Sequence, residues 1–196
     1  MLEWILDIDR DLLLHINSWY STYPDYIMSF ITDKWSGVPI YAMVLFFLFY
    51  KRNPKVAVIM LIAILLTFAL TDFLGVHLFK NVFKKFRPGH DPLTMDFVRI
   101  LDPYGGKYGF ISNHAANFFG FALVSSAFLK KRWYTIFIFS WAIAVAYSRL
   151  YLGKHFPLDV ICGAMFGALV GYAILLFHRF LVNKFLLYQR LNVKHT

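Results

Sequence analysis

Residues 148–159 read Ser-Arg-Leu-Tyr-Leu-Gly-Lys-His-Phe-Pro-Leu-Asp and join two strongly apolar runs of the chain. A polar segment between two apolar runs is expected at a membrane surface. Its polar side chains are Ser148, Arg149, Lys154, His155 and Asp159. A charge at the centre of a span costs about 2.5–3.5 kcal/mol, so such a cluster at the mouth of a span indicates a function.

The residue types in this segment suit the handling of phosphate. An arginine guanidinium such as Arg149 can donate two parallel hydrogen bonds to phosphate oxygens. A neutral imidazole such as His155 can attack phosphorus, and a carboxylate on its other nitrogen sets the tautomer and stabilises the developing charge. Pro157 suits the first turn of a helix, which places Asp159 about one turn after His155. Taken alone, the two residues also fit an interfacial aromatic and a first-turn acid.

Two further groups of polar residues precede this segment. They are Lys80 with Arg87-Pro88, and Ser112-Asn113-His114 at the start of another apolar run. In this order the three groups resemble the type 2 phosphatidic acid phosphatase superfamily, which also includes the vanadium haloperoxidases. Its pattern is K-x6-R-P, then P-S-G-H, then S-R-x5-H-x3-D. The first and third motifs are complete here, whereas Ile111 and Asn113 replace the Pro and Gly of the second.

The resemblance implies a role for each residue of the predicted site. His155 is the expected nucleophile, which forms a phosphohistidine, Asp159 orients it, and His114 is the general acid for the leaving oxygen. The phosphate-binding residues implied are Lys80, Arg87, Ser112, Asn113 and Arg149. No metal or other cofactor is expected, because cations stand where a metallophosphatase clusters carboxylates and histidines.

Ser112 and Asn113 begin a predicted helix, whose N-terminal amides point toward a bound anion. The same two residues are also ordinary helix caps, a role that is compatible with phosphate binding. Glycine lets a backbone approach an anion closely, and asparagine tolerates the left-handed region better than most residues. We therefore expect an intact phosphate cradle with a changed shape and a changed substrate preference.

The composition is typical of a membrane protein. Apolar residues make up 59% of the 196 residues and charged residues 16%, against about 45–50% and about 25% in soluble domains. The length predicts a single domain, residues 1–196. The formal net charge of +9 is spread between apolar runs, which favours anionic lipid headgroups over nucleic acid as partners. With Cys162 as the one cysteine, no intrachain disulfide is expected.

The predicted fold is an all-α integral membrane bundle of about five transmembrane helices, preceded by an amphipathic interfacial helix. The predicted spans are 35–50, 56–79, 113–129, 133–147 and 157–177. Residues 1–34 fit an amphipathic helix in the membrane interface or, equally well, a cap packed on the bundle. Gly163, Gly167 and Gly171 recur at four-residue spacing, which allows another helix backbone to approach closely.

Five spans bring all three motifs to one membrane face. The residues concerned are Lys80 and Arg149 at span ends and Ser112 and Asp159 at span starts. The basic turns 51–55 and 130–132 fall on the opposite face, which the positive-inside rule places in the cytoplasm. The long polar loop 81–111 is then outside. Asp72 and His77, inside the second span, fit a structural or a functional role equally well.

These observations predict an integral membrane lipid phosphatase that acts at the periplasmic face of a bacterial-type inner membrane. The leading substrate is undecaprenyl diphosphate, followed by lipid A phosphate and then by phosphatidylglycerophosphate or phosphatidic acid, an order that comes from the resemblance. Two other classes are a non-catalytic lipid-binding protein and a transporter. The two complete motifs argue against the first class, and the lack of internal repeats argues against the second.

Overall fold

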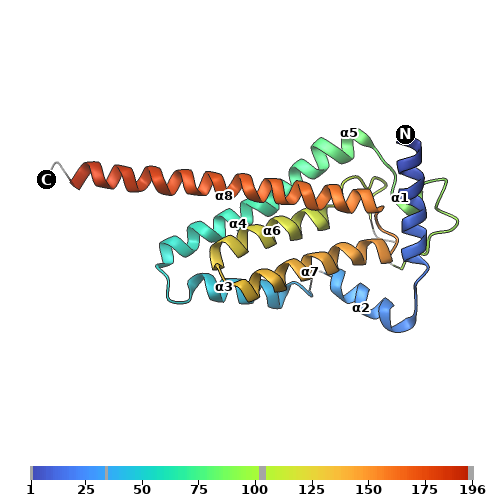
Figure 1. Cartoon of the computed structure of the whole chain (residues 1–196), viewed down its shortest axis with the longest axis horizontal. Helices are drawn as coiled ribbons and strands as arrows, with labels where there is room; N and C mark the ends of the chain where they lie inside the picture. The colour runs from blue at the N-terminus through green and yellow to red at the C-terminus, as the bar shows by residue number, and fades with distance from the viewer. Residues whose placement is uncertain (1, 34, 102–104, 194–196) are drawn as a thin grey trace.

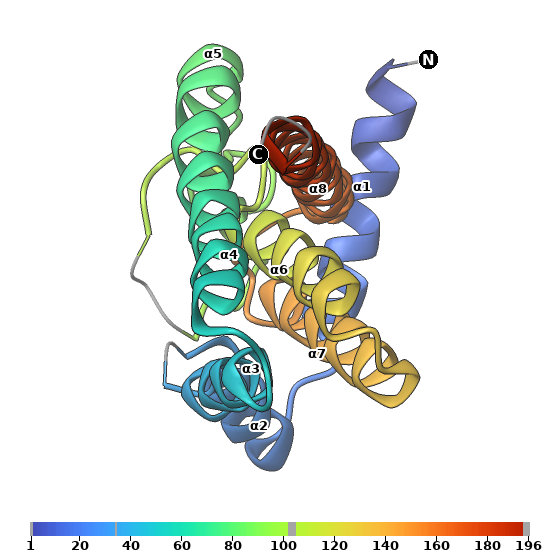
Figure 2. The ribbon, with the colours of Figure 1, turned by 90° about the vertical axis from the view of Figure 1, so that its left-hand side faces the viewer.

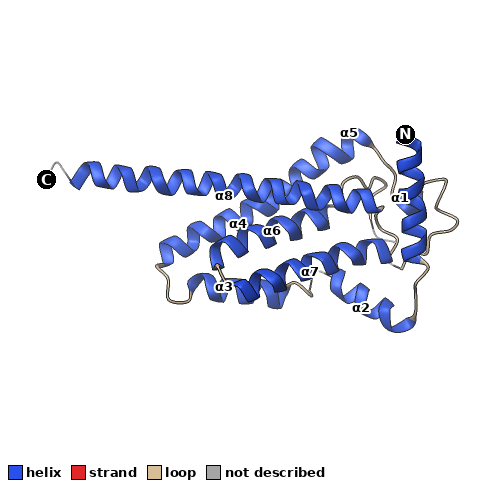
Figure 3. Ribbon diagram, viewed as in Figure 1, coloured by secondary structure: helices blue, strands red, loops and turns tan. Residues whose placement is uncertain are grey.

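The computed structural model of the chain describes residues 2–33, 35–101 and 105–193, and the side chains of 3–33, 35–101 and 105–185. The described part consists of helices and loops (Figure 3), which confirms the all-α prediction. Most of its helices run along one common axis (Figure 1). They are α3 (Val38–Phe49), α4 (Pro54–Leu74), α6 (Asn113–Leu129), α7 (Arg132–Tyr151) and α8 (Pro157–Val193).

Helix α6 lies at the centre of the bundle. In a view along the axis, α4, α7 and α8 surround it and α3 packs beside α4 (Figure 2). The buried core is formed by aliphatic and aromatic side chains such as Ile64, Phe121 and Ile138. Many large apolar side chains point outward instead, among them Leu65, Met165 and Leu169. Exposed apolar surface of this extent is expected of a bundle that faces lipid.

The glycines of α8 form the seam against α6. A Cβ added to Gly167 would lie 1.9 Å from the carbonyl oxygen of Ala116, and one added to Gly163 would lie 2.5 Å from that of Ser112. The predicted close approach at this glycine spacing is therefore confirmed. The α6 side of the seam also carries a small residue, Gly120, which the glycine pattern of α8 did not reveal. The seam fixes the start of α6 against the start of α8.

Each predicted span corresponds to an observed helix, but most of the predicted ends differ from the observed ones. The predicted span 113–129 matches α6 at both ends. Helix α8 continues beyond the predicted span 157–177 to Val193, because no proline or glycine interrupts the helix after residue 171. Within the described part of the chain, two stretches, Pro54–Phe83 and Pro157–Phe185, are long and apolar enough to cross a membrane. Helix α3 has 12 residues, about 18 Å, against a hydrocarbon core of about 30 Å. The number of five spans therefore stays a prediction.

Residues 2–32 form two helices where one was predicted. Helix α1 (Leu2–Asn17) and helix α2 (Thr22–Thr32) are separated by a turn. The Asn17 side chain donates hydrogen bonds to the carbonyls of Tyr151 and Arg99, at 2.7 and 2.9 Å, and so fixes the chain where α1 ends. Helix α1 lies across the end of the bundle (Figure 1), as a packed cap would.

The two faces of α1 differ. Asp9, Leu13 and Asn17 are buried against the bundle at four-residue spacing. The stripe Trp4, Ile8 and Leu12, also at four-residue spacing, is exposed. The cap prediction is thus confirmed, and the exposed apolar stripe suits the predicted position in the membrane interface.

All three motifs lie at the end of the bundle that α1 covers. Helix α4 continues into a π-helical turn, η1 (Gly75–Lys80), and then into α5 (Asn81–Phe83). The chain next passes through an extended segment to η2 (Pro88–His90). Figure 1 shows that α6 and α8 begin at this end, where α7 also ends.

Candidate active site

The connection between α7 and α8 brings His155 back into the protein. Gly153 adopts a left-handed conformation, φ +68°, directly after the last residues of α7. This is the common way for a helix to end. The backbone N–H groups of Lys154 and His155 then donate to the carbonyl of Arg149, at 2.9 and 3.3 Å. A side chain at residue 153 would also meet the carbonyl of Arg99 at 2.8 Å, so glycine is required there.

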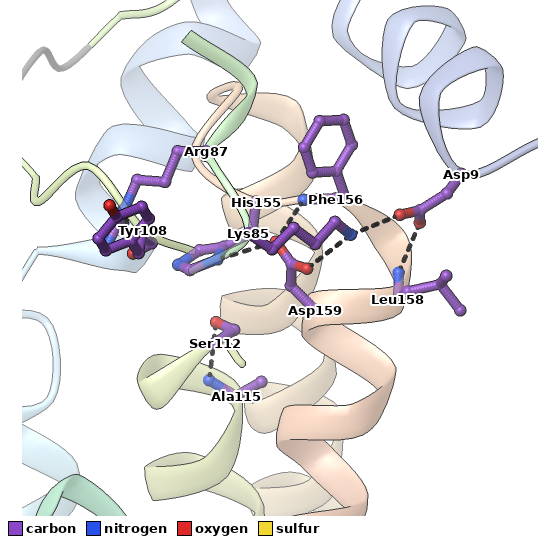
Figure 4. A network of polar contacts seen from close by, with 10 residues as sticks. All are labelled: Asp9, Lys85, Arg87, Tyr108, Ser112, Ala115, His155, Phe156, Leu158 and Asp159. Carbon is purple, nitrogen blue, oxygen red and sulfur yellow. Dashed lines mark hydrogen bonds and ion pairs between the residues drawn. The ribbon is translucent and has the colours of Figure 1, made fainter. Parts of the chain in front are cut away.

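His155 and Asp159 form a buried pair. The two residues are 1% and 0% exposed, and the imidazole Nδ1 of His155 lies 3.5 Å from Asp159 Oδ2 (Figure 4). The same carboxylate oxygen accepts the backbone N–H of Phe156 at 3.1 Å, in the manner of a residue in the first turn that caps its own helix. Asp159 is therefore both a helix-capping acid and the partner of His155. Catalytic hydrogen bonds are often long in an empty site and tighten around substrate.

Three cations lie within electrostatic range of this imidazole. Burial lowers the pKa of His155 well below its usual value, and the positive charges of Arg87, Arg149 and Lys80 lower it further, while a backbone hydrogen bond to Gly109 opposes them. His155 is consequently neutral near pH 7, which is the form that can act as a nucleophile. The predicted convergence of Lys80, Arg87 and Arg149 on His155 is present in the structure.

The cations come from three different elements. Lys80 is the last residue of η1 and is half-buried, whereas Arg149 lies in the last turn of α7 and is 6% exposed. Arg149 also donates from Nη1 to the Thr32 hydroxyl on α2. Arg87 lies in the extended segment before Pro88, and its Nε donates to the carbonyl of Tyr108 at 3.4 Å (Figure 4).

The start of α6 completes the cluster. Ser112 is the N-cap of α6, with its Oγ accepting the N–H of Ala115 at 3.4 Å, as the cap interpretation predicted. Its own backbone N–H donates to the carbonyl of Asp159 at 2.9 Å, which joins the second motif to the third. His114, in the first turn, is half-buried and lies within electrostatic range of His155 and of all three cations.

Asn113 is anchored on α4. Its Nδ2 donates to Asp72 Oδ1 at 2.9 Å, and Asn117, one turn further along α6, donates to the same oxygen at 3.1 Å. Asp72 therefore joins α4 to α6 next to the site, which is a structural role. His77 instead stacks on the exposed ring of Phe73, with centroids 4.1 Å apart, so the structure favours its structural interpretation.

Two residues at the site carry no motif signal. Lys85 lies between Lys80 and Arg87, and its Nζ donates to Asp159 Oδ1 at 2.9 Å. Gly109 fills the narrow space between Arg87 and Asp159, because a Cβ there would lie 3.1 Å from an atom of each. Lys85 could have been suspected from Pro88, since the residue before a proline is held extended and side chains two apart share a face.

The described residues hold no group of three histidine, cysteine, aspartate or glutamate side chains arranged for a metal ion. The expectation that the reaction needs no metal stays a prediction. The negative charges of the site are instead matched by lysine and arginine side chains.

The sequence matches a known family along most of its length. Residues 55–182 match the PAP2 superfamily. The chain belongs to this superfamily. It has the same fold as a solved PAP2-type phosphatidylglycerolphosphate phosphatase from Bacillus subtilis, with a TM-score of 0.72 at 23% identity over 89% of this chain and 86% of that one.

Several curated relatives are phosphatases. The chain is 39% identical to the lipid A 4'-phosphatase of Porphyromonas gingivalis over 88% of its length and 74% of that protein. It is also 39% identical to the lipid A 4'-phosphatase of Bacteroides thetaiotaomicron over 88% and 77%. Its identity to the undecaprenyl-diphosphatase of Sulfolobus acidocaldarius is 28%, over 69% and 60%. The protein is thus a membrane lipid phosphatase, a phosphoric ester hydrolase, as the resemblance implied.

Proposed function

We propose that this membrane phosphatase hydrolyses a phosphate monoester on a lipid A headgroup and releases phosphate. The observation that carries the proposal is the 39% identity to two lipid A 4'-phosphatases over 88% of the chain, compared with 28% to an undecaprenyl-diphosphatase. The leading substrate expected from the sequence, undecaprenyl diphosphate, becomes the second candidate on the same comparison. Both substrates present a phosphate to the same cationic site.

The proposed reaction has two displacements at phosphorus. In the first, neutral His155 attacks the phosphorus, the bond from phosphorus to the sugar oxygen breaks, and His114 donates a proton to that oxygen. In the second, water attacks the phosphorus of the phosphohistidine, the bond from phosphorus to the His155 nitrogen breaks and phosphate leaves, with His114 proposed as the base that takes the proton of the water. Asp159 holds the imidazole and stabilises its positive charge.

The cations act on the phosphoryl oxygens. Charge on these oxygens is stabilised in the transition state by preorganised positive groups, for which we propose Lys80, Arg87 and Arg149. We further propose that the Ser112 hydroxyl and the backbone N–H groups near Asn113, at the start of α6, donate hydrogen bonds to these oxygens. Every catalytic group in this scheme is a side chain or backbone group of the protein, so activity should persist in the presence of a chelator.

Phosphate release from a panel of lipids tests the proposal. The purified protein is offered lipid A, undecaprenyl diphosphate, phosphatidylglycerophosphate and phosphatidic acid at equal surface concentration in detergent micelles, with and without EDTA. We expect the highest kcat/KM on lipid A, unchanged by EDTA, and no release by His155→Ala. A higher kcat/KM on undecaprenyl diphosphate would make that lipid the substrate in place of lipid A. Activity that is lost in EDTA and restored by magnesium or zinc would contradict the mechanism.

The face of the membrane is part of the proposal. We place the motifs on the periplasmic face of the inner membrane, supported by the basic turns at the opposite end of the bundle. In a Cys162→Ala background, a cysteine at exposed position 96 should react with an impermeant thiol reagent added outside, and one at exposed position 55 should not. The reverse labelling pattern would invert the orientation.

A further inference from the structure

Lys85 connects the N-terminal helix to the reacting pair. Its Nζ donates to Asp9 Oδ2 on α1 at 2.8 Å and to Asp159 Oδ1 on α8 at 2.9 Å (Figure 4). The side chain of Asp9 is 2% exposed and that of Asp159 is 0% exposed. Two buried carboxylates thus share one ammonium group, and one of them is the carboxylate that faces His155.

Asp9 also holds the start of α8 directly. Its second oxygen, Oδ1, accepts the backbone N–H of Leu158 at 2.7 Å. The N–H groups in the first turn of a helix have no partner within the helix and need one from elsewhere. A residue 149 positions earlier in the chain therefore caps the helix that carries Asp159. Burial raises the pKa of Asp9, and the hydrogen bonds from Lys85 and Leu158 oppose this shift.

The contacts of Lys85 determine which way the Asp159 carboxylate faces. Oδ1 is held by Lys85, so Oδ2 is left for the Phe156 N–H and for His155. Burial lowers the pKa of Lys85, but the charges of Asp159 and Asp9 outweigh this effect and raise it, so the ammonium form is stable. Its Nζ also lies 4.5 Å from the centre of the Phe156 ring. Lys85 is thus held in place by α1 on one side and by the start of α8 on the other.

The backbone explains why Lys85 reaches this position. Residues 85–87 run extended beside 107–109, with backbone hydrogen bonds from Gly109 to Lys85 and from Arg87 to Lys107. Alternate side chains of an extended segment share a face. Lys85 and Arg87 therefore both point toward the start of α8, whereas Phe86 stacks on Tyr108. One segment supplies a cation proposed for the phosphate and a cation for the carboxylate that orients the nucleophile.

We propose that Lys85 and Asp9 are positioning residues for the His155–Asp159 pair, so that helix α1 is part of the catalytic apparatus. The proposal rests on the proposed role of His155 as nucleophile. Lys85 fixes the rotation of the Asp159 carboxylate, and Asp9 fixes Lys85 and the first turn of α8. Neither residue touches the phosphate. Their loss should therefore slow the chemical step and leave the affinity for the headgroup almost unchanged.

Lys85→Met tests the first step, with exposed Lys84→Met as the matched control. We expect kcat on the preferred lipid to fall about 10- to 100-fold, the size seen when outer partners of metal ligands are lost, with KM changed less than about twofold. The rate of phosphohistidine formation should fall equally. Lys85→Arg, which keeps the charge, should recover part of the loss, and Lys84→Met should match wild type.

Asp9→Asn tests the second step, with exposed Asp11→Asn as control. Asparagine keeps an acceptor for Leu158, so the fold should survive, and thermal unfolding in detergent verifies this. If Asp9 acts through Lys85, the double variant should be no slower than Lys85→Met alone.

Other results would overturn the proposal. An unchanged kcat in folded Lys85→Met, a loss confined to KM, or losses that multiply in the double variant would each contradict it. If His155→Ala turns over at the wild-type rate, the proposed function fails instead. The two failures are therefore distinguishable.

Discussion

The site is assembled from two regions with different exposure. In residues 148–159, His155 and Asp159 are almost fully buried and Arg149 is 6% exposed. In the other region, Lys80, Arg87, Asn113 and His114 are only half-buried. The first region is held by backbone hydrogen bonds and by contacts from α1, and the second includes a π-helical turn and the segment after it.

This difference separates reactivity from recognition. A nucleophile must be held close to its reacting geometry, which requires packed neighbours whose own positions are fixed. A headgroup needs room to enter, and groups at the open side can follow its shape. Changes in residues 148–159 should therefore affect the rate on every substrate, whereas changes at the half-buried region should depend on which lipid is offered.

The largest effect is expected from His155→Ala. Loss of a nucleophile should lower kcat on the order of 10⁴-fold or more on all lipids, while the cations still bind the headgroup. Rapid quench with ³²P-labelled lipid should show acid-labile, base-stable label on wild type and none on the variant. Vanadate takes the five-coordinate shape of the transition state. It should bind to His155→Ala, but more weakly than to wild type. Turnover near the wild-type rate would remove His155 as the nucleophile.

His114→Ala should separate substrates by their leaving group. A positioned acid contributes about 10²–10⁴-fold in rate, and its contribution is greatest for a poor leaving group. A phosphate monoester on a sugar should lose that factor, whereas an aryl phosphate or a lipid diphosphate should lose much less. The check is kcat on both classes in the same micelles. Equal losses on both would contradict the acid role.

Gly167→Ala should disturb the seam that joins the two regions. Its Cβ would lie 1.9 Å from the carbonyl oxygen of Ala116, so α6 and α8 must separate, at a cost of about 1–3 kcal/mol. The melting temperature in detergent should fall, and kcat should fall about tenfold as His114 moves away from His155. Gly171→Ala, whose Cβ would meet its nearest atom at 3.1 Å, is the control and should have a smaller effect. Equal melting temperatures would show that the seam adapts.

Asn113→Gly should have the smallest effect on rate. The change restores the family residue and removes the hydrogen bond to Asp72, while the backbone N–H stays in place. We expect kcat within about tenfold of wild type and a changed order of preference between monophosphate and diphosphate lipids. Asn117→Ala, which also removes a contact to Asp72 but lies one turn away from the site, is the control. An unchanged order in Asn113→Gly would exclude this residue as a determinant.

The positions of several predicted site residues relative to one another follow from short motifs in the sequence, and their roles stay predictions. Lys80, Arg87, Arg149 and His155 belong to two of the three short motifs that resemble the family, and the structure brings the three cations within electrostatic range of the His155 imidazole. Asp159 could be predicted from its position one helical turn after His155. Asp9 could not, because a single aspartate in an acidic helix is also typical of a solvated surface, and the sequence signal for Lys85 was limited to its position two residues before Arg87-Pro88.

By itself, the sequence determined the helical bundle, the limits of α6, the close approach of α8 to another helix and the residues proposed to react with phosphate. These properties depend on local composition, on periodicity and on short spacings along the chain. The tertiary structure decided that residues 2–32 form two helices, that α1 caps the bundle, and that Asp9 reaches Leu158 and Lys85 across 149 and 76 positions. Such contacts depend on how distant helices pack, and no local pattern in the chain records them.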